Sequence, residues 1–124
     1  MSNTTHTPTE TEKALRDFVF QQIEIWNAGR KEDFLALYRR SAPAGLTLEY
    51  VAKQTLTADA AWTGLNHMWD AYNATVRLQL VECIVNGNEA ACYFRNRRPG
   101  ELTLSSGIEL YHLHEGVLHA RFFH

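Results

Sequence analysis

The sequence predicts an α+β fold in which helices cover one face of an antiparallel sheet. From Thr75 to His124 the chain reads as four apolar-rich strands, separated by turn signals at 86–88, 99–100 and 115–116. Asn and Gly at such positions accept the positive φ angles that tight hairpins need. Most of the chain before Thr75 has the apolar spacing of helices. A helical first half followed by an antiparallel meander is typical of this fold class.

Two helices are predicted in the N-terminal third. Residues 9–12, Thr-Glu-Thr-Glu, form a capping-box pattern that begins the first helix. Gly29 ends it, because glycine is the usual left-handed stop of a helix. A shorter helix is expected over residues 31–39, where apolar side chains again recur at helical spacing.

One strand and a third helix complete the first half of the chain. Residues 46–51 alternate between apolar and polar side chains, which predicts a strand. The third helix could begin at Thr57 or at Thr63. Gly64 favours the later start, because glycine weakens a helix interior.

Length and charge indicate the number of domains and the kinds of partner to expect. The 124 residues correspond to one domain, which we expect over residues 9–124 after a flexible, Ser/Thr/Asn-rich tail over residues 1–8. A net charge of −2 provides no general attraction to nucleic acid or anionic membranes. No apolar run approaches the ~18 residues of a membrane span, and no signal peptide is evident. We therefore expect a cytoplasmic protein without nucleic-acid or membrane partners.

The two cysteines, Cys83 and Cys92, would face each other across two strands if the hairpin turn is Gly87-Asn88. In a reducing compartment we expect them to be packing residues with free thiols rather than a disulfide.

Three sequence patterns resemble the nuclear transport factor 2-like superfamily, which includes ketosteroid isomerase and the SnoaL-like polyketide cyclases. Residues 23–38 resemble its first two helices, residues 63–72 the start of its third helix, and residues 111–118 its penultimate hairpin. The resemblance covers nearly the whole chain. It implies a cone-shaped, cystatin-like fold, with a curved antiparallel sheet wrapped around the N-terminal helices in a single SnoaL-like domain.

The resemblance can be carried to individual catalytic positions. Gln22 stands where the isomerases have a tyrosine oxyanion donor, and Tyr50 stands where they have the general-base aspartate. Glu109 matches their second acidic donor. A tyrosine with a pKa near ~10 is a poor base at neutral pH. We therefore expect a protein that is not a standard ketosteroid isomerase.

Two registers are open for the last hairpin. A three-residue loop over 114–116 pairs Glu109 with Arg121, whereas a two-residue loop over 115–116 pairs Leu110 with Arg121. We prefer the first register, because opposite charges favour each other across neighbouring strands.

In the preferred register, charged and aromatic residues share one sheet face, which the resemblance makes concave. Arginines bind carboxylates or enolates bidentately and aromatic rings hold an apolar body, so this face suits an anionic or polarised ligand. Glu109 is the predicted acid/base, and Arg97 and Arg121 are predicted to stabilise negative charge. The predicted ligand-binding residues are Gln22, Trp26, Tyr50, Trp69, Tyr93, Arg95, Tyr111 and Phe123.

The opposite face is the more apolar one, and it carries Cys92, Phe94, Leu104, Ile108, Leu110, Leu118 and Phe122. Either this face is the core and the charged face is solvated, or a partner subunit covers it. We favour the second alternative and predict a homodimer. A two-residue turn at Pro99-Gly100 would pair Arg97 with Leu102 and so exchange the two faces of the following strand. This assignment therefore requires a three-residue loop there or a bulge near Gly107.

The resemblance, together with the charged and aromatic face, thus implies a small-molecule pocket for acid/base chemistry, such as isomerisation, cyclisation, dehydration or hydrolysis, on a partly apolar carbonyl compound. The alternatives are a non-catalytic pocket for an anionic metabolite and a structural dimerisation domain. We expect no cofactor and no metal, because His112 and His114 lack further ligands at a recognisable spacing.

Overall fold

The computed structural model describes residues 7–100 and 105–123. The helices are α1 (Glu10–Ala28), α2 (Lys31–Ser41) and α3 (Ala58–Tyr72). The strands are β1 (Gly45–Tyr50), β2 (Gln54–Thr57), β3 (Arg77–Asn86), β4 (Glu89–Arg97), β5 (Ser105–His114) and β6 (Val117–Phe123). The predicted helical first half and the four-stranded meander are both confirmed. In the described part of the chain, no helix is long and apolar enough to cross a membrane.

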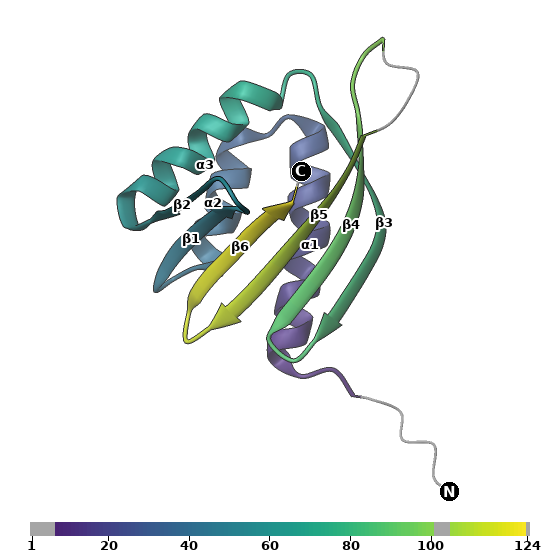
Figure 1. The fold of residues 1–124 in the computed structure, drawn as a ribbon. Coiled ribbons are helices and arrows are strands. Elements are labelled where there is room, and N and C mark those ends of the chain that lie inside the picture. The colour runs from purple at the N-terminus through teal and green to yellow at the C-terminus, as the bar shows by residue number, and fades with distance from the viewer. Residues whose placement is uncertain (1–6, 101–104, 124) are drawn as a thin grey trace, which may run out of the picture.

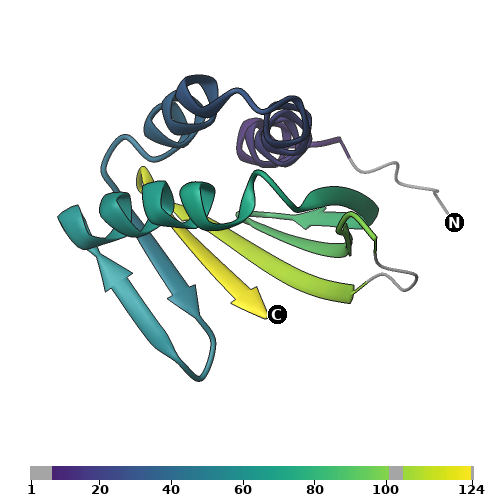
Figure 2. The same cartoon turned by 90° about the horizontal axis from the view of Figure 1, so that it is seen from above.

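The six strands form one curved sheet in the order β2-β1-β6-β5-β4-β3 (Figure 1). β1 pairs with β6 in parallel, and all other neighbouring strands are antiparallel. The helices lie against one face of this sheet, as the view from above shows (Figure 2). The predicted α+β class is therefore confirmed, with the short strand β2 as an unpredicted addition. We call the helix-covered face the inner face and the opposite one the outer face.

The capping box that the sequence predicts begins α1. Thr9 Oγ1 accepts a hydrogen bond of 3.1 Å from the Glu12 N–H, and Glu12 Oε1 accepts one of 2.8 Å from the Thr9 N–H. The buried Glu12 reaches further, because its Oε2 accepts a 2.8 Å hydrogen bond from the Gly87 N–H. One carboxylate thus joins the start of α1 to the β3–β4 turn.

α3 begins earlier than the sequence predicts. Thr57 is the N-cap, and Gly64 lies inside the helix. A Cβ atom at Gly64 would lie 2.5 Å from Leu56 Cδ1, so the glycine lets α3 approach β2 closely. The prediction failed because the glycine serves packing between two elements rather than a helix end.

The C-terminal end of α1 is fixed to the outer edge of β3. The Asn27 carboxamide donates to the Leu78 carbonyl and accepts from the Leu78 N–H, both at 2.9 Å. Trp26 Nε1 donates to the Val76 carbonyl at 2.9 Å. The Asn27 side chain therefore makes the hydrogen bonds to this edge strand that a neighbouring strand would otherwise make.

The β3–β4 hairpin turns at Gly87-Asn88, and Cys83 lies directly opposite Cys92 as predicted. Their sulfur atoms are 3.9 Å apart and both thiols are free. Burial, followed by the neighbouring Cys83, raises the pKa of the Cys92 thiol well above its usual range. The pair therefore consists of packing residues with free thiols.

The preferred register of the last hairpin is wrong. Glu109 pairs with Phe122, and Leu110 pairs with Arg121, around a two-residue turn. Both turn residues have positive φ, 51° at Glu115 and 78° at Gly116, as a type I′ hairpin requires. This register buries Phe122, which is worth ~1.5–3 kcal/mol, whereas an exposed ion pair contributes only ~0–1 kcal/mol.

The β4–β5 pairing also reverses the predicted faces. Tyr93 pairs with Ile108 on the outer face, and the pairing runs without a bulge from Glu89 to Asn96. The bulge lies on β3 instead, between Leu80 and Glu82. Of the predicted outer apolar row, Phe94 and Phe122 are buried in the core, Ile108 is exposed, and Leu104 lies outside the described residues. Neither alternative describes the whole row, because Phe94 and Phe122 lie in the core whereas Ile108 lies on the outer face.

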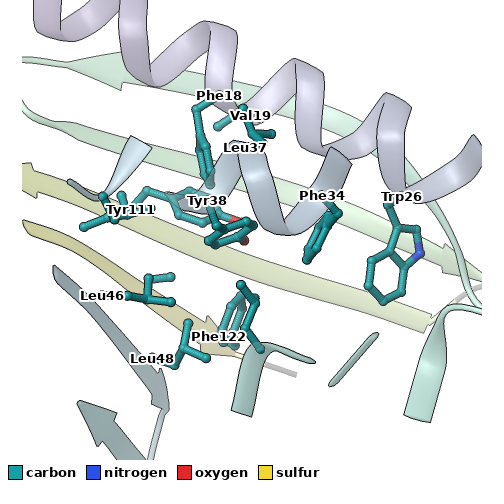
Figure 3. Close-up of a cluster of buried hydrophobic side chains, with 14 of the residues drawn as sticks. Phe18, Val19, Trp26, Phe34, Leu37, Tyr38, Leu46, Leu48, Tyr111 and Phe122 are labelled. Atoms are coloured by element: carbon teal, nitrogen blue, oxygen red, sulfur yellow. The ribbon is translucent and has the colours of Figure 1, made fainter. Parts of the chain in front are cut away.

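The core lies between the helices and the inner sheet face (Figure 3). Tyr38 and Tyr111 approach each other beneath Phe18, with ring centroids 4.9 Å and 5.3 Å from the Phe18 ring. Trp26 and Phe34 form a second group of rings, 5.6 Å apart. Of these rings, Tyr38, Trp26 and Phe34 line a cavity beneath the helices.

Candidate functional site

A cavity of about 220 Å³ lies between the helices and the inner sheet face. The helices contribute Gln22, Trp26, Phe34, Tyr38, Met68 and Tyr72, and the sheet with its loops contributes Tyr50, Lys53, Val76, Leu78, Asn96, Arg98, Glu109 and Phe122. Its walls are mainly apolar and aromatic, with a few convergent polar groups, as in typical ligand sites.

A larger hollow of about 460 Å³ lies between α1, α2 and the β5–β6 turn. Its charged side chains, Asp17, Arg40 and Glu115, are exposed to solvent. Exposed charges are strongly hydrated and screened by solvent, so they make a poor catalytic environment. The smaller cavity is the better candidate because its acidic group, Glu109, is only 7 % exposed.

A buried hydrogen-bond relay ends at Glu109. The Tyr38 hydroxyl donates to Gln22 Oε1 at 2.7 Å, and Gln22 Nε2 donates to the Tyr111 hydroxyl oxygen at 2.7 Å. The Tyr111 hydroxyl in turn donates to Glu109 Oε1. Each donor thus points toward the carboxylate, and the chain of bonds fixes its position.

The two phenols of the relay act as donors. Burial, with the charge of Glu109 as the second cause, raises the pKa of Tyr38 and Tyr111 well above the usual range. Both hydroxyls therefore keep their protons at neutral pH. The carboxylate at the end of the relay accepts from Tyr111 and also lines the cavity, where a ligand can reach it.

Tyr50 lies on the same cavity. Its ring packs on Phe122 with centroids 5.4 Å apart. Burial is the largest cause that raises its pKa, and Tyr72 and Glu109 add to the effect. A phenol with a raised pKa is a hydrogen-bond donor rather than a base.

Two further kinds of polar group line the cavity. Lys53 and Arg98 are exposed, which places them where the cavity meets solvent. Asn96 is buried on the inner face, and among the described residues no donor reaches its Oδ1 atom. The cavity therefore has cations at its rim and an acidic and an amide side chain on its walls.

No protein-family model matches the chain, and no curated protein sequence matches it. Solved structures do match across the chain. A candidate SnoaL-like polyketide cyclase from Jannaschia sp. CCS1 is 13% identical, with a TM-score of 0.66 over 96% of this chain and 90% of that one. An NTF2-like protein of unknown function from Mesorhizobium loti is 14% identical, with a TM-score of 0.70 over 97% and 98%.

A candidate ketosteroid isomerase from Kribbella flavida DSM 17836 is 13% identical, with a TM-score of 0.67 over 90% of this chain and 79% of that chain. The chain has the NTF2-like fold. The expected fold resemblance is thereby confirmed, and identities this low carry the fold alone.

The NTF2-like fold brings only some of the predicted site residues together. Glu109, Gln22, Trp26 and Tyr50 line the cavity, and Tyr111 bonds to Glu109. Trp69 does not line the cavity. It packs behind it, with its ring centroid 5.1 Å from Trp26.

The predicted arginine cluster does not lie in the cavity. Strand alternation places five predicted residues on the outer face: Tyr93, Arg95, Arg97, Arg121 and Phe123. Arg121 Nε donates to Glu49 Oε1 at 3.1 Å rather than pairing with Glu109. The assignment failed because it depended on the β5–β6 and β4–β5 registers, and shifting a register by one residue exchanges the two faces.

Several cavity residues were missed by the sequence reasoning, among them Tyr38, Lys53, Asn96 and Arg98. Asn96 carried a usable signal, because it continues the apolar alternation of Ala90, Cys92 and Phe94. A polar residue in such a row points to the inner face. Tyr38 and Lys53 carried no comparable signal, because tertiary packing alone brings them to the cavity.

Proposed function

We propose that this chain is a small enzyme that performs acid/base chemistry on a small, partly apolar carbonyl compound. One observation carries the proposal: Glu109 lines an aromatic cavity while a buried relay of three donor groups holds its carboxylate. Isomerisation, cyclisation and dehydration next to a carbonyl all begin with a proton transfer of this kind. The candidate cyclase and isomerase among the similar folds add support.

In this proposal Glu109 takes the proton from the carbon adjacent to the carbonyl. The Tyr111 hydroxyl keeps the carboxylate oriented, which general-base catalysis requires. The Tyr50 hydroxyl donates to the carbonyl oxygen and stabilises the negative charge that develops there. In the isomerases that the sequence resembles, the base stands at the position of Tyr50 and an acidic donor at the position of Glu109. Here the two roles are exchanged.

Proton abstraction can be tested without knowing the substrate. We would incubate 1-indanone and 2-tetralone with the protein in D₂O and follow loss of the α-proton signals by NMR. Glu109→Gln is nearly isosteric but cannot accept a proton. Arg121→Gln is the matched control, because it removes a charge from the outer face.

We expect the wild type and Arg121→Gln to accelerate exchange equally, and Glu109→Gln to lose about 10²–10⁴-fold, the usual contribution of a general base. Equal rates for Glu109→Gln and the wild type would refute the assignment of Glu109. A wild type that exchanges neither ketone faster than buffer would contradict the proposed chemistry.

A second candidate function is a non-catalytic pocket for an anionic metabolite. Lys53 and Arg98 at the rim favour it, because two cations raise the local concentration of an anion. Under this alternative, benzoate would bind with a strong dependence on salt and no ketone would exchange protons.

We also propose that the chain forms a homodimer through the outer sheet face. Exposed apolar side chains lie there on β3, β5 and β6, with Ile84 59%, Ile108 47% and Phe123 36% exposed. Ile108 pairs directly with both Tyr93 and Phe123, so the apolar surface is continuous across β4, β5 and β6.

A further inference from the structure

Asn96 is a buried amide on the cavity wall, outside the Glu109 relay. It lies on the inner face of β4, opposite Leu78 of β3, and is 7 % exposed. In the described part of the chain, its Oδ1 atom is the buried side-chain polar atom without a hydrogen-bond partner. The other buried amides near the cavity are bonded: Gln22 within the relay, and Asn73 to the Trp26 carbonyl at 2.8 Å.

An unpaired buried acceptor lowers the stability of the ligand-free protein, because it has lost its hydrogen bonds to water. Folded proteins keep few such groups, and each requires an explanation. An apolar residue at this position would continue the row of Cys92 and Phe94 without that cost. The position therefore makes sense if a ligand supplies the missing donor.

We infer that Asn96 determines ligand specificity by accepting a hydrogen bond from an O–H or N–H group of the ligand. The inference rests on the proposed small-molecule pocket, but it does not require Glu109 to be catalytic. A site built around a hydrogen bond rejects analogues that lack the donor, because its own polar group is then left unpaired.

The sheet register separates this contact from Glu109. Cys92 pairs with Glu109, and Asn96 lies four residues further along the same strand, a backbone separation of about 14 Å at ~3.4 Å per residue. Between them, Phe94 faces Gly107, which has no side chain. The ligand thus has a carbonyl at the Glu109 end and a donor at the Asn96 end.

The cavity limits the size of this ligand. Its volume of about 220 Å³ is below the ~300–1,000 Å³ of sites for drug-sized ligands. The rings of Trp26, Phe34 and Phe122 line it. These features indicate a compact hydroxy- or amino-substituted cyclic ketone of one or two rings.

A first experiment needs no ligand. Asn96→Leu replaces the amide with an apolar side chain of similar size, and we expect the melting temperature to rise by about 2–4 °C. Asn73→Leu is the matched control and should lower it, because Asn73 bonds to the Trp26 carbonyl. A fall of several degrees for Asn96→Leu would show a structural role and overturn the inference.

A second experiment measures specificity with 6-hydroxy-1-indanone and 6-methoxy-1-indanone, which differ in one O–H donor. By NMR titration, we expect the wild type to bind the hydroxy compound at least about tenfold more tightly. Asn96→Leu should reduce this preference to within about twofold, and Glu109→Gln should retain it. An unchanged preference in Asn96→Leu would overturn the inference.

The outcomes separate this inference from the proposed function. If Glu109→Gln exchanges ketone protons like the wild type, the catalytic proposal fails while the Asn96 preference stands. If Asn96→Leu keeps the preference while Glu109→Gln loses exchange, the Asn96 inference fails alone. If neither indanone binds the folded wild type at millimolar concentration, the inference is also overturned.

Discussion

At the scale of single residues, Glu109 and Glu49 are acidic side chains of the same sheet that lie in different environments. Glu109 is on the inner face, where it accepts from a phenol and lines an aromatic cavity. Glu49 is on the outer face, within 3.1 Å of Arg121 Nε and 3.0 Å of His119 Nε2. The first arrangement suits proton transfer from a ligand to the carboxylate, whereas the second is a partly solvated ion-pair cluster.

The Glu49 cluster predicts a pH effect on stability. The hydrogen bond from Arg121, more than that from His119, lowers the pKa of the Glu49 carboxyl in the folded state. A group with a lowered folded-state pKa stabilises the fold above its unfolded pKa and loses that contribution as pH falls through its folded pKa. We therefore expect Glu49→Gln to be less stable than the wild type at pH 7, with the difference disappearing toward pH 3. Denaturant unfolding from pH 7 to pH 3 measures this, and a constant difference would contradict it.

At the scale of elements, one side chain joins α1 to the β3–β4 hairpin. Glu12 closes the capping box and accepts from the Gly87 N–H. We expect Glu12→Ala to lower the free energy of unfolding by ~1–3 kcal/mol, because a helix cap and a buried backbone donor both lose their partner.

Glu10→Ala is the control for this prediction. Glu10 is also in the first turn of α1, but its carboxylate is 94% exposed and 3.6 Å from Lys13 Nζ. It should change stability by less than ~0.5 kcal/mol. Urea unfolding of the three proteins gives the comparison, and equal losses for the two variants would show that Glu12 contributes only helix-end charge.

The elements also show which features a sequence can predict. The capping box at Thr9 and the stop at Gly29 depend on neighbours within one turn, and both were predicted correctly. The β5–β6 register depends on a positive φ at Glu115, a residue type that rarely adopts it, and on the burial of Phe122 against the helices. Local patterns therefore gave the order of elements, but long-range packing decided which face lines the cavity.

The candidate site was likewise predictable only in part. Glu109, Gln22 and Tyr50 were found because they match positions of a resembled family, and all three line the cavity. The arginine assignments failed with two registers. The β5–β6 pairing places Arg121 on the outer face, and strand alternation in β4, which pairs with β5 without a bulge, places Arg97 there.

At the scale of the whole molecule, no helix of the described residues covers the outer sheet face (Figure 2). We expect sedimentation equilibrium at micromolar concentration to show a dimer, and Ile108→Lys to shift it toward monomer, because a buried unpaired charge opposes association. Phe20→Lys is the control, since Phe20 is 50% exposed on α1, away from the sheet. A monomeric wild type would contradict the proposed interface.

The central claim is that Glu109 in the inner cavity, and not the arginine-rich outer face, performs the chemistry. The most direct test is the ratio of α-proton exchange rates for Glu109→Gln and Arg121→Gln with the same ketone in D₂O. We expect a rate for Arg121→Gln equal to that of the wild type and a rate for Glu109→Gln about 10²–10⁴-fold lower. Loss of exchange in Arg121→Gln with retention in Glu109→Gln would contradict it.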